Sequence, residues 1–456
     1  MCGILGAFDL PSLDVSARLE LIAHRGPDGS GVYAAGPARH GHVRLALLDL
    51  SAASDQPFRF HDGVLSFNGE IWNFRALRNA LRFEGVEFRT SGDTEVLAAA
   101  LATWGVDATL PRLEGMFAFA WSRGDVHVLV RDRFGKVPLY VHRQRAGWAW
   151  SSERKGLGLE YPAAPLPPGT VLDLTTGAMR RWYDLPATSG DNRPLADLLT
   201  AGVEARMVAD APLCCLISGG LDSSLILSIA KAMRPDIVAY TAILDDASPD
   251  LKAARRLCDE FAVPLVEVRV AAPTPNDLAA AALAIEIPSK AQVEIAAMCI
   301  PLARAIAGDG FKACLSGEAA DELFGGYGNM CIAGASADDA GWRAIRVAQL
   351  AKMARGNFVR CNKAFMAAGV ECRLPFMERA LVETVMAMDK AACPPGKKAL
   401  KAASVGIVPK WIASRPKETF QGGAGMDDAA AAVIGDPARF YRAEVFTAYG
   451  AAAVAR

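Results

Sequence analysis

The feature that most constrains the fold is a change in sequence pattern near residue 190. Residues 1–185 contain short alternating apolar segments separated by turn residues, which predicts strands joined by tight turns, among them 43–48 and 126–131. From Leu213 onward, short apolar segments alternate with helical patterns, which is typical of a parallel sheet covered by helices. The strands predicted for that sheet are 213–217, 237–244, 265–270 and 312–315. The segment 185–194 (LPATSGDNRP) is polar and rich in turn-forming residues, and it is therefore the predicted linker between two domains.

The two predicted domains belong to different fold classes. Runs of strands with a few helices in residues 1–185 predict an α+β layered domain. The alternating pattern in residues 195–456 predicts an α/β domain with a parallel sheet, and the last part of that domain has the pattern of helices. In such a sheet, binding sites form at the carboxyl ends of the strands.

The charge balance narrows the classes of partner. The chain has 49 Lys and Arg residues and 50 Asp and Glu residues, a net charge of −1. Proteins that bind nucleic acid independently of its sequence carry an excess of basic residues, and this chain has no such excess. No apolar run approaches the ~20 residues that span a bilayer. Because the first basic residue is Arg18, the N-terminus lacks the charged region of a signal peptide. We expect a cytoplasmic protein without nucleic-acid or membrane partners.

The positions of the histidines restrict the chemistry of the second domain. All six histidines lie at or before His142, so the rest of the chain has no imidazole base or metal ligand of its own. Carboxylates and lysines must carry any chemistry there, and Mg²⁺ bound by oxygen atoms is the natural metal. The ten cysteines form no CxxC pair, and nine of them are expected to be reduced structural thiols.

Cys2 is the exception among the cysteines. If Met1 is removed, Cys2 carries a free α-amine beside its thiol. An α-amine has an ordinary pKa of about 8, and it can act as the general base for its own side chain. A nucleophile built in this way needs no histidine.

Six further segments follow Cys2 in a fixed order. They are His24-Arg25-Gly26-Pro27-Asp28, Arg44-Leu45-Ala46, Phe67-Asn68-Gly69-Glu70, Ser91-Gly92-Asp93-Thr94-Glu95, Gly115-Met116-Phe117-Ala118 and Arg131-Asp132. Together with Cys2 they resemble class II glutamine amidotransferases, in which an N-terminal cysteine hydrolyses glutamine to glutamate and ammonia. The resemblance covers residues 1–185 and implies a layered sandwich of the N-terminal-nucleophile type.

The resemblance also implies roles for individual residues. Cys2 would be the nucleophile. Asn68 and the backbone N–H of Gly69 would form the oxyanion hole, where each donor is worth ~3–4 kcal/mol. Arg44 would bind the α-carboxylate of glutamine through two contacts. Asp93 would bind its α-ammonium group, with Glu70 close by.

A second motif lies in the second domain, between an apolar segment and a helical pattern. Ser218-Gly219-Gly220-Leu221-Asp222-Ser223-Ser224 lacks the ending of a Walker loop, but its small residues let backbone N–H groups approach phosphate oxygens. An aspartate among phosphates needs a cation, so Asp222 is a candidate Mg²⁺ ligand.

This motif resembles the pyrophosphate loop of ATP pyrophosphatases, which adenylate a substrate and release pyrophosphate. The segment 316–327 (SGEAADELFGGY) resembles the second metal and nucleotide loop of asparagine synthetases. Matches to that family continue at residues 248–253 (SPDLKA), 369–376 (GVECRLPF) and 416–420 (PKETF). The two domains in this order resemble the glutamine-hydrolysing asparagine synthetase family, whose substrates are glutamine, ATP and a small carboxylic acid.

By this resemblance, Asp222 and Asp321 would bind Mg²⁺ that bridges the pyrophosphate. Lys417 would stabilise charge on the α-phosphate, and Glu318 would manage the proton of the incoming ammonia. The residues that would contact ATP, with the adenine-flanking side chains first, are Leu216, Ile217, Ile243, Ser218, Gly219, Gly220, Ser223, Ser224, Ser316 and Gly317. Lys397, Lys398 and Lys401 are interpreted as a solvated helix face.

The sequence departs from the family where the acceptor would bind. A segment of type Thr-Thr-x-Arg-Ala-Ser aligns without gaps with residues 291–296 (AQVEIA), so the threonines and the arginine are absent. Glu294 stands where an arginine would neutralise the acceptor's carboxylate, and Gln292 lies beside it. Two facing carboxylates repel in a dry pocket. We therefore expect an acceptor other than aspartate, with aspartate itself as the alternative.

Two other functions stay open from the sequence. An ATP-dependent cyclase resembling β-lactam synthetases shares this fold, but such enzymes have lost glutaminase function, whereas Cys2 and its partners are intact here. A tRNA-modifying pyrophosphatase is disfavoured by the neutral charge balance and by the glutaminase half. A homodimer is also left open.

Overall fold

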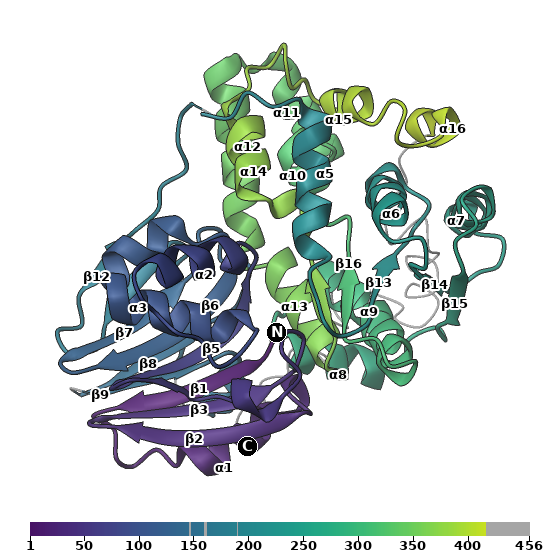
Figure 1. The fold of residues 1–456 in the computed structure, drawn as a ribbon. Helices are drawn as coiled ribbons and strands as arrows, with labels where there is room; N and C mark the ends of the chain where they lie inside the picture. The colour runs from purple at the N-terminus through teal and green to yellow at the C-terminus, as the bar shows by residue number, and fades with distance from the viewer. Residues whose placement is uncertain (146, 159–161, 189, 416–456) are drawn as a thin grey trace.

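A computed structural model describes residues 1–145, 147–158, 162–188 and 190–415. Figure 1 shows two antiparallel sheets on one side of the molecule and a parallel sheet with its helices on the other. The N-terminus lies at the boundary between them, beside α13 (Asn357–Met366). Lys417 and the segment 416–420 lie outside the described residues.

The first half of the chain contains two six-stranded antiparallel sheets. The first sheet has the order β10 (Ala164–Pro165), β8 (Tyr140–Gln144), β9 (Gly147–Ser151), β1 (Gly3–Phe8), β3 (Ala38–Arg44) and β2 (Gly29–Ala35). The second sheet has the order β12 (Met179–Arg181), β11 (Thr170–Asp173), β7 (Val126–Arg131), β6 (Gly115–Arg123), β5 (Gly63–Ile71) and β4 (Phe58–Phe60).

Three apolar clusters show that these sheets form the middle of a four-layer sandwich. Ile4 on β1 and Met116 on β6 belong to one cluster between the two sheets. A second cluster joins the outer face of the second sheet to α2 (Phe74–Phe83) and α3 (Asp93–Thr109). A third joins the outer face of the first sheet to α1 (Val15–Leu19) and α4 (Arg154–Leu157). The predicted layered α+β fold is confirmed.

The burial of side chains explains why the sequence pattern predicts some strands and misses others. Every residue of β1 and β5 is buried, because both faces of the inner strands are covered. The strand predicted at 126–131 is confirmed as β7, but the strand predicted at 43–48 is wrong: β3 ends at Arg44. Leu45 and Leu47 are buried outside the sheet, so their apolar character did not indicate a strand. The sequence pattern does not predict β2, because the glycines and alanines of this strand carry little apolar signal.

The second half contains a five-stranded parallel sheet, as predicted. Its order is β15 (Leu265–Arg269), β14 (Ala239–Ile243), β13 (Leu213–Leu216), β16 (Ala313–Leu315) and β17 (Glu371–Arg373). The remaining helices are α5 (Leu195–Arg206), α6 (Leu221–Met233), α7 (Pro249–Glu260), α8 (Pro275–Ile285), α9 (Lys290–Gly308), α10 (Ala320–Phe324), α11 (Gly328–Ser336), α12 (Asp339–Met353), α14 (Arg379–Ala387), α15 (Lys398–Ala403) and α16 (Lys410–Ser414).

The two halves meet through polar contacts, some partly exposed and some buried. Asp28 forms an ion pair with Lys312 at 2.7 Å, and Arg25 donates to Asn362 on α13 at 3.0 Å. The segment predicted as the linker has no helix or strand among its described residues, and α5 begins at Leu195. The domain boundaries at 185 and 195 remain a prediction.

Among the described residues, α9 is the one helix with the length and apolar composition of a membrane span. It carries Glu294 and Arg304, and its side chains join an apolar cluster with α8 and α13. By these contacts α9 is a core helix of the second half.

Candidate functional site

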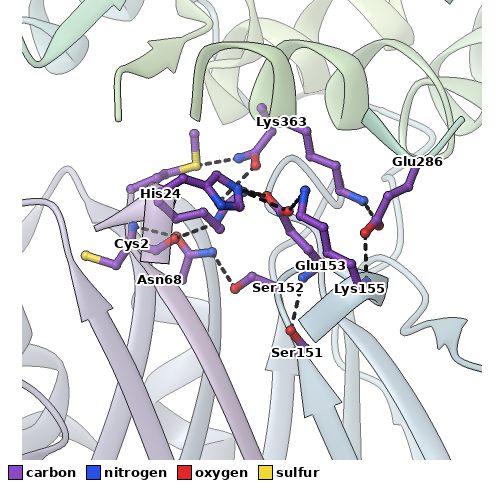
Figure 2. Close-up of polar contacts among 12 residues, drawn as sticks. Cys2, His24, Asn68, Ser151, Ser152, Glu153, Lys155, Glu286 and Lys363 are labelled. Carbon is purple, nitrogen blue, oxygen red and sulfur yellow. Dashed lines mark hydrogen bonds and ion pairs between the residues drawn. The ribbon is translucent and has the colours of Figure 1, made fainter. Parts of the chain in front are cut away.

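Cys2 lies at the start of the first sheet, under the second half of the chain (Figure 2). Its backbone N–H donates to Asn68 Oδ1 at 2.9 Å, and its Sγ lies 3.7 Å from the carbonyl oxygen of Leu45. Burial raises the pKa of the Cys2 thiol, and the nearby ammonium group of Met1 partly opposes that rise. The Cys2 thiol, the predicted nucleophile, is therefore buried and faces a neutral carbonyl group.

Asn68 and Gly69 come from the middle of β5, which places them beside Cys2. Asn68 Nδ2 donates to Ser152 Oγ at 3.1 Å, and that same oxygen accepts from the backbone N–H of Ile4 at 2.9 Å. Gly69 has a φ of +148°, and a Cβ there would overlap the carbonyl group of Met116. The amide of Asn68 is thus oriented by Ser152, which the sequence analysis missed.

The predicted glutamine-binding residues surround this position, but Arg44 is engaged elsewhere. The Arg44 guanidinium donates to the Ser51 carbonyl and to Asp55 Oδ1, both at 2.7 Å, so it holds the loop that follows it. Asp93 accepts from the backbone N–H of Ile71 at 2.9 Å, and burial raises its pKa to about 6. Glu70 is buried as well, and its burial raises its pKa well above the ordinary value.

Arg25 connects Cys2 to the second half of the chain. This arginine is fully buried, and its Nε donates to the Cys2 carbonyl at 3.0 Å. Its other nitrogens donate to Glu153 at 2.7 Å and to Asn362 at 3.0 Å. Although burial opposes ionisation, Lys155, His24 and Arg25 together hold the pKa of Glu153 well below its ordinary value. The motif containing Arg25 was recognised in the sequence, but this role was not.

A second polar cluster continues from the same region into α13. Glu286 accepts from the backbone N–H groups of Arg154 at 2.9 Å and Lys155 at 2.8 Å, and it forms an ion pair with Lys363 (Figure 2). Glu286 ends α8 in a left-handed conformation, with a φ of +56°. The cluster fixes the position of α13 against the first half.

The predicted ATP-binding residues gather at the carboxyl ends of β13 and β16. The Ser218 N–H donates to Ser223 Oγ at 3.1 Å, closing a loop before α6. Gly219 has a φ of +73°, and a Cβ there would overlap the Asp250 carbonyl. A Cβ at Gly317 would lie 2.8 Å from the Ser223 nitrogen, so the two nucleotide loops touch.

The other predicted ATP-contact residues lie on or beside these loops. Ile217 and Ile243 are buried at the ends of β13 and β14, and Leu216 is half-buried between them. Ser224 Oγ is buried and has no hydrogen-bond partner among the described residues. Ser316 Oγ accepts from the Glu318 N–H at 3.3 Å, which begins the second loop. Gly220 caps α6.

Asp222 and Asp321 converge on one cation, the ammonium group of Lys397. The Nζ atom lies 2.5 Å from Asp222 Oδ2 and 2.6 Å from Asp321 Oδ1. Although burial opposes protonation, the two carboxylates raise the pKa of Lys397 above its ordinary value. The interpretation of Lys397 as part of a solvated face was wrong, whereas Lys398 and Lys401 are exposed as expected.

The two aspartates fit a hard cation in part. Carboxylate oxygens are suitable ligands for Mg²⁺, and their convergence shows that one small cation can touch both. In the described part of the chain, no group of three or more His, Cys, Asp or Glu side chains could hold a metal. A metal at this position would therefore take its remaining ligands from phosphate or water.

Glu318 is surrounded by polar groups from α13. It forms an ion pair with Arg360, accepts from Asn357 Nδ2 at 3.0 Å and contacts Cys361 Sγ at 3.4 Å. Gln292, predicted to bind the acceptor, bonds to Asn357 at 2.9 Å and to Arg360 at 3.0 Å. Gln292 therefore lies in the same polar cluster as Glu318.

A second glutamate adjoins this cluster. Glu322 accepts from the Tyr327 hydroxyl at 2.7 Å and from Asn357 at 2.8 Å. Burial, reinforced by the charge of Glu318, raises the pKa of Glu322 to about 7. Sequence analysis did not single out Asn357, Arg360 or Glu322, because none of them stands out without the folded neighbours.

The side chain of Glu294 projects from α9 in a different direction from that of Gln292. Its carboxylate is fully buried and lies 3.5 Å from Lys290, one turn earlier on the same helix. Residues two apart on a helix project about 200° from one another, so Glu294 and Gln292 leave opposite sides. The interpretation that both residues face the acceptor does not fit this arrangement, since Gln292 is the one bonded to the surroundings of Glu318.

Comparisons with known proteins agree with this two-site organisation. A family model described as a glutamine amidotransferase domain matches residues 1–167, and one described as asparagine synthase matches residues 194–341 and 331–436. The chain is 31% identical to the glutamine-hydrolyzing asparagine synthetase B of Escherichia coli (strain K12), over 93% of this chain and 83% of the relative. It is 30% identical to the glutamine-hydrolyzing asparagine synthetase 1 of Arabidopsis thaliana, over 91% of this chain and 74% of the relative.

Solved structures give weaker similarities. The glutamine phosphoribosylpyrophosphate amidotransferase of B. subtilis is 19% identical, with a TM-score of 0.35 over 59% of this chain and 66% of that chain. The NMN synthetase of Francisella tularensis is 14% identical, with a TM-score of 0.28 over 57% of this chain and 94% of that chain. The fold assignment therefore rests on the sheets described above and on the family matches. The chain belongs to the glutamine-hydrolysing asparagine synthetase family, ligases that form a C–N bond with glutamine as the amide donor.

Proposed function

We propose that this protein uses Cys2 to release ammonia from glutamine and uses ATP to activate a carboxylic acid that the ammonia then attacks. The observation that carries the proposal is the pair Asp222 and Asp321, which come from the two nucleotide loops and share one cation, the ammonium group of Lys397. Cys2 and its neutral partners supply the other half of the reaction. We place the enzyme in the cytoplasm, because its ten free cysteines suit a reducing compartment.

The first reaction begins once Met1 has been removed. The α-amine of Cys2 takes the thiol proton, and Sγ attacks the side-chain carbonyl of glutamine. Asn68 Nδ2 and the Gly69 N–H donate to the developing oxyanion. Asp93 binds the α-ammonium of glutamine, and Arg44 binds the α-carboxylate if its bond to Asp55 opens. The C–N bond breaks, ammonia leaves with the proton, and water hydrolyses the thioester to glutamate.

The second reaction joins the acceptor carboxylate to the α-phosphate of ATP and releases pyrophosphate. The loops at 218–224 and 316–317 bind the nucleotide, with the helix dipole of α6 favouring its phosphates. Asp222 and Asp321 would hold Mg²⁺, which when bound neutralises charge on the pyrophosphate. For this, Lys397 moves from the aspartates towards the phosphates. Glu318 accepts a proton from the ammonia as it attacks the adenylate and AMP leaves.

For the acceptor, the pocket favours a carboxylic acid that carries no second carboxylate. Glu318, Glu322 and Asp321 already crowd this region with negative charge, and Arg360 is committed to Glu318. Gln292, which bonds to Asn357 and Arg360 in the same cluster, is neutral and offers no charge to a second carboxylate. Aspartate is the second candidate, because relatives at about 30% identity carry the name asparagine synthetase.

The test combines an acceptor panel with one variant. Purified protein is incubated with glutamine, ATP, Mg²⁺ and single carboxylic acids, and both pyrophosphate and glutamate release are measured. We expect pyrophosphate release with a monocarboxylic acceptor to exceed release with aspartate by at least ~10-fold, because a second unpaired carboxylate is costly in the pocket. Faster release with aspartate would identify aspartate as the acceptor.

The Cys2→Ala variant separates the two reactions. Glutamine-dependent synthesis should fall by at least ~10³-fold, because the nucleophile is lost. Synthesis from added ammonium chloride should persist within about twofold, because Cys2 lies outside the second site. Equal loss of both activities would contradict the two-site scheme. Pyrophosphate release without any glutamate from the parent protein would instead indicate a cyclase.

A further inference from the structure

The loop that follows Arg44 is held by residues from both halves of the chain. This loop, residues 45–51, connects β3 to the short 3-10 helix Ala52–Ser54. Near its start, the Leu45 carbonyl faces the Cys2 thiol at 3.7 Å. Its middle bonds to Asp210 and Ala211, which belong to the second half. A segment that borders the predicted glutamine site therefore depends on the second half for its position.

Three hydrogen bonds join this loop to the second half. The backbone N–H groups of Asp210 and Ala211 both donate to the Leu47 carbonyl, at 2.9 and 3.2 Å. In the opposite direction, the Asp49 N–H donates to Asp210 Oδ2 at 2.7 Å. The bond to Oδ2 is the one that a substitution of the Asp210 side chain removes, because the other two use the backbone.

Asp49 links this contact to both residues predicted to bind the α-carbon end of glutamine. Its carbonyl accepts from the Arg44 guanidinium, the group predicted to bind the α-carboxylate. Its carboxylate accepts from the Ser91 N–H at 2.7 Å, two residues before Asp93, which is predicted to bind the α-ammonium group. Asp210 therefore holds the one residue that touches both of these segments.

The backbone of Asp49 has a conformation that its surroundings must maintain. Its φ is +47°, in the left-handed region that residues with a Cβ seldom adopt. Its carboxylate accepts from the Ser51 N–H at 3.1 Å and from the Ser51 hydroxyl at 2.6 Å. Although burial opposes ionisation, the hydrogen bonds from Ser51 and Ser91 lower the pKa of Asp49 to about 2. The bond to Asp210 is the one that holds its N–H.

Side-chain packing fixes this loop only in part. Leu48 and Asp49 are half-buried, and Leu50 is 54% exposed. A cavity of about 270 Å³ lies beside the loop. The residues that line this cavity are Leu48, Phe74, Arg75, Arg78, Ser91 and Asp210. Because a segment with few buried apolar contacts opens easily, the position of the loop depends on its hydrogen bonds.

Asp210 itself lies on a well-anchored segment. Arg373, which is fully buried, donates to the carbonyl groups of Arg206 and Val208, both at 2.8 Å. Asp210 follows these residues and lies three positions before β13, the middle strand of the parallel sheet. The carboxylate is thus carried by the framework of the second half.

We propose that Asp210 is a positioning residue of the glutamine site, because its carboxylate holds Asp49 and thereby fixes Arg44 relative to Asp93. The proposal rests on the proposed function, in which this site binds glutamine. Among the described residues, the Asp210 carboxylate accepts one hydrogen bond, that of Asp49, so it acts on glutamine through the loop. The glutamine site of the first half is complete only when the second half supplies this residue.

The kinetic test measures glutamine hydrolysis by two variants of the full-length protein. Asp210→Ala should raise the KM for glutamine by at least about fivefold, because the loop loses a hydrogen bond to a charged group. Its kcat should stay within about twofold of the parent, since the substitution leaves Cys2 and Asn68 in place. Asp210→Asn retains a carbonyl oxygen that can accept from the Asp49 N–H, so its KM should stay within about twofold.

Three outcomes would overturn the proposal. They are an unchanged KM in Asp210→Ala, an equal rise of KM in Asp210→Asn, and a parallel loss of synthesis from added ammonium chloride. Asp197→Ala is the matched control, because Asp197 is an exposed aspartate of the second half in the first turn of α5. Its KM should match that of the parent, and a rise equal to that of Asp210→Ala would also count against a specific role.

Hydrogen–deuterium exchange tests the contact without any reaction. In the absence of glutamine, the peptide that contains the Asp49 amide should exchange at least about fivefold faster in Asp210→Ala than in the parent. Asp210→Asn should exchange as the parent does. Equal exchange in Asp210→Ala and the parent would show that the carboxylate does not hold the loop. If the parent releases no glutamate, the proposed function fails, while the exchange rates still decide whether Asp210 positions Asp49.

Discussion

The two candidate sites are both buried, but they are built from different kinds of group. The thiol and the backbone N–H of Cys2 contact neutral groups, the Leu45 carbonyl and the Asn68 amide, and the Ser152 hydroxyl lies behind Asn68, while the Arg25 guanidinium holds the Cys2 carbonyl. Around Glu318 and the nucleotide loops, the contacts join opposite charges, as in Lys397 with Asp222 and Asp321 and Arg360 with Glu318.

The difference follows from the chemistry that each site has to perform. A thiol attacking an amide creates one oxyanion, and fixed neutral dipoles stabilise it without a charge of their own. A nucleotide brings several negative charges, so its site needs carboxylates for a metal and cations for phosphate. In the structure, the charged side chains of the second site pair with one another. The first site should therefore be sensitive to loss of neutral groups, and the second to loss of charge.

The largest effect should come from neutralising one of the two carboxylates proposed to hold a metal. Asp321→Asn should lower ATP-dependent synthesis by ~10²–10³-fold with glutamine and with ammonium chloride alike, because both routes use the second site. Pyrophosphate release reports the loss, and glutamate release without ATP should be preserved. Asp309→Asn, which alters only a bond to Tyr240 at 2.7 Å, is the matched control. A loss of synthesis with glutamine but not with ammonium chloride would contradict the placement of Asp321 in a site that both routes use.

A smaller effect should follow removal of one neutral hydroxyl from the first site. Ser152→Ala frees the Asn68 amide, and a lost buried hydrogen bond of about 1.4 kcal/mol corresponds to ~10-fold in the kcat of glutamine hydrolysis. Synthesis from ammonium chloride should not change. Ser151→Ala is the neighbouring control, because that hydroxyl accepts from the Glu153 N–H at 3.2 Å instead. Equal effects of the two variants would show that Ser152 has no specific role.

The smallest effect concerns stability rather than activity. The pKa of Glu322 is raised from 4.5 to about 7, so the folded state favours its protonated form. The resulting stabilisation is present below pH 4.5 and is lost as the pH rises to about 7. Glu322→Gln cannot ionise, so its free energy of unfolding should gain about 1–3 kcal/mol relative to the parent between pH 5 and pH 7.5.

Urea unfolding at several pH values measures this difference. Glu267→Gln provides the opposite case, because its hydrogen bond with Arg255 lowers the pKa of Glu267. Removing that carboxylate should not produce a relative gain as the pH rises. A difference between Glu322→Gln and the parent that does not vary with pH would show that the buried carboxyl does not titrate in this range.

Much of the fold could be predicted because the two sheets leave different patterns in the sequence. β7 and the parallel strands β13 to β16 lie in the predicted segments, because their side chains are uniformly apolar or alternate regularly. β17 could not be found in this way. Its sequence, Glu371-Cys372-Arg373, has charged ends that are buried only because Met1, Arg373 and Glu371 pair with one another.

The candidate sites, too, could be predicted only in part from the sequence. Cys2, Asn68, Asp222 and Asp321 could be identified because they lie within contiguous motifs. Their partners come from distant parts of the chain: Ser152 reaches Asn68 across 84 positions, and Lys397 reaches Asp222 across 175. The sequence also could not predict where the Glu294 side chain points. An ungapped alignment gives its position on α9 but not which neighbours that side of the helix meets.

Helix α13, which is ten residues long, contacts residues from both halves of the chain. Asn357 and Arg360 near its start contact Glu318, whereas Asn362 and Lys363 near its end contact Arg25 and Glu286. An α-helix of this length is about 15 Å long and moves as a rod. This one helix therefore joins the polar contacts around Glu318 to those around Arg25 and Glu286 at a fixed spacing.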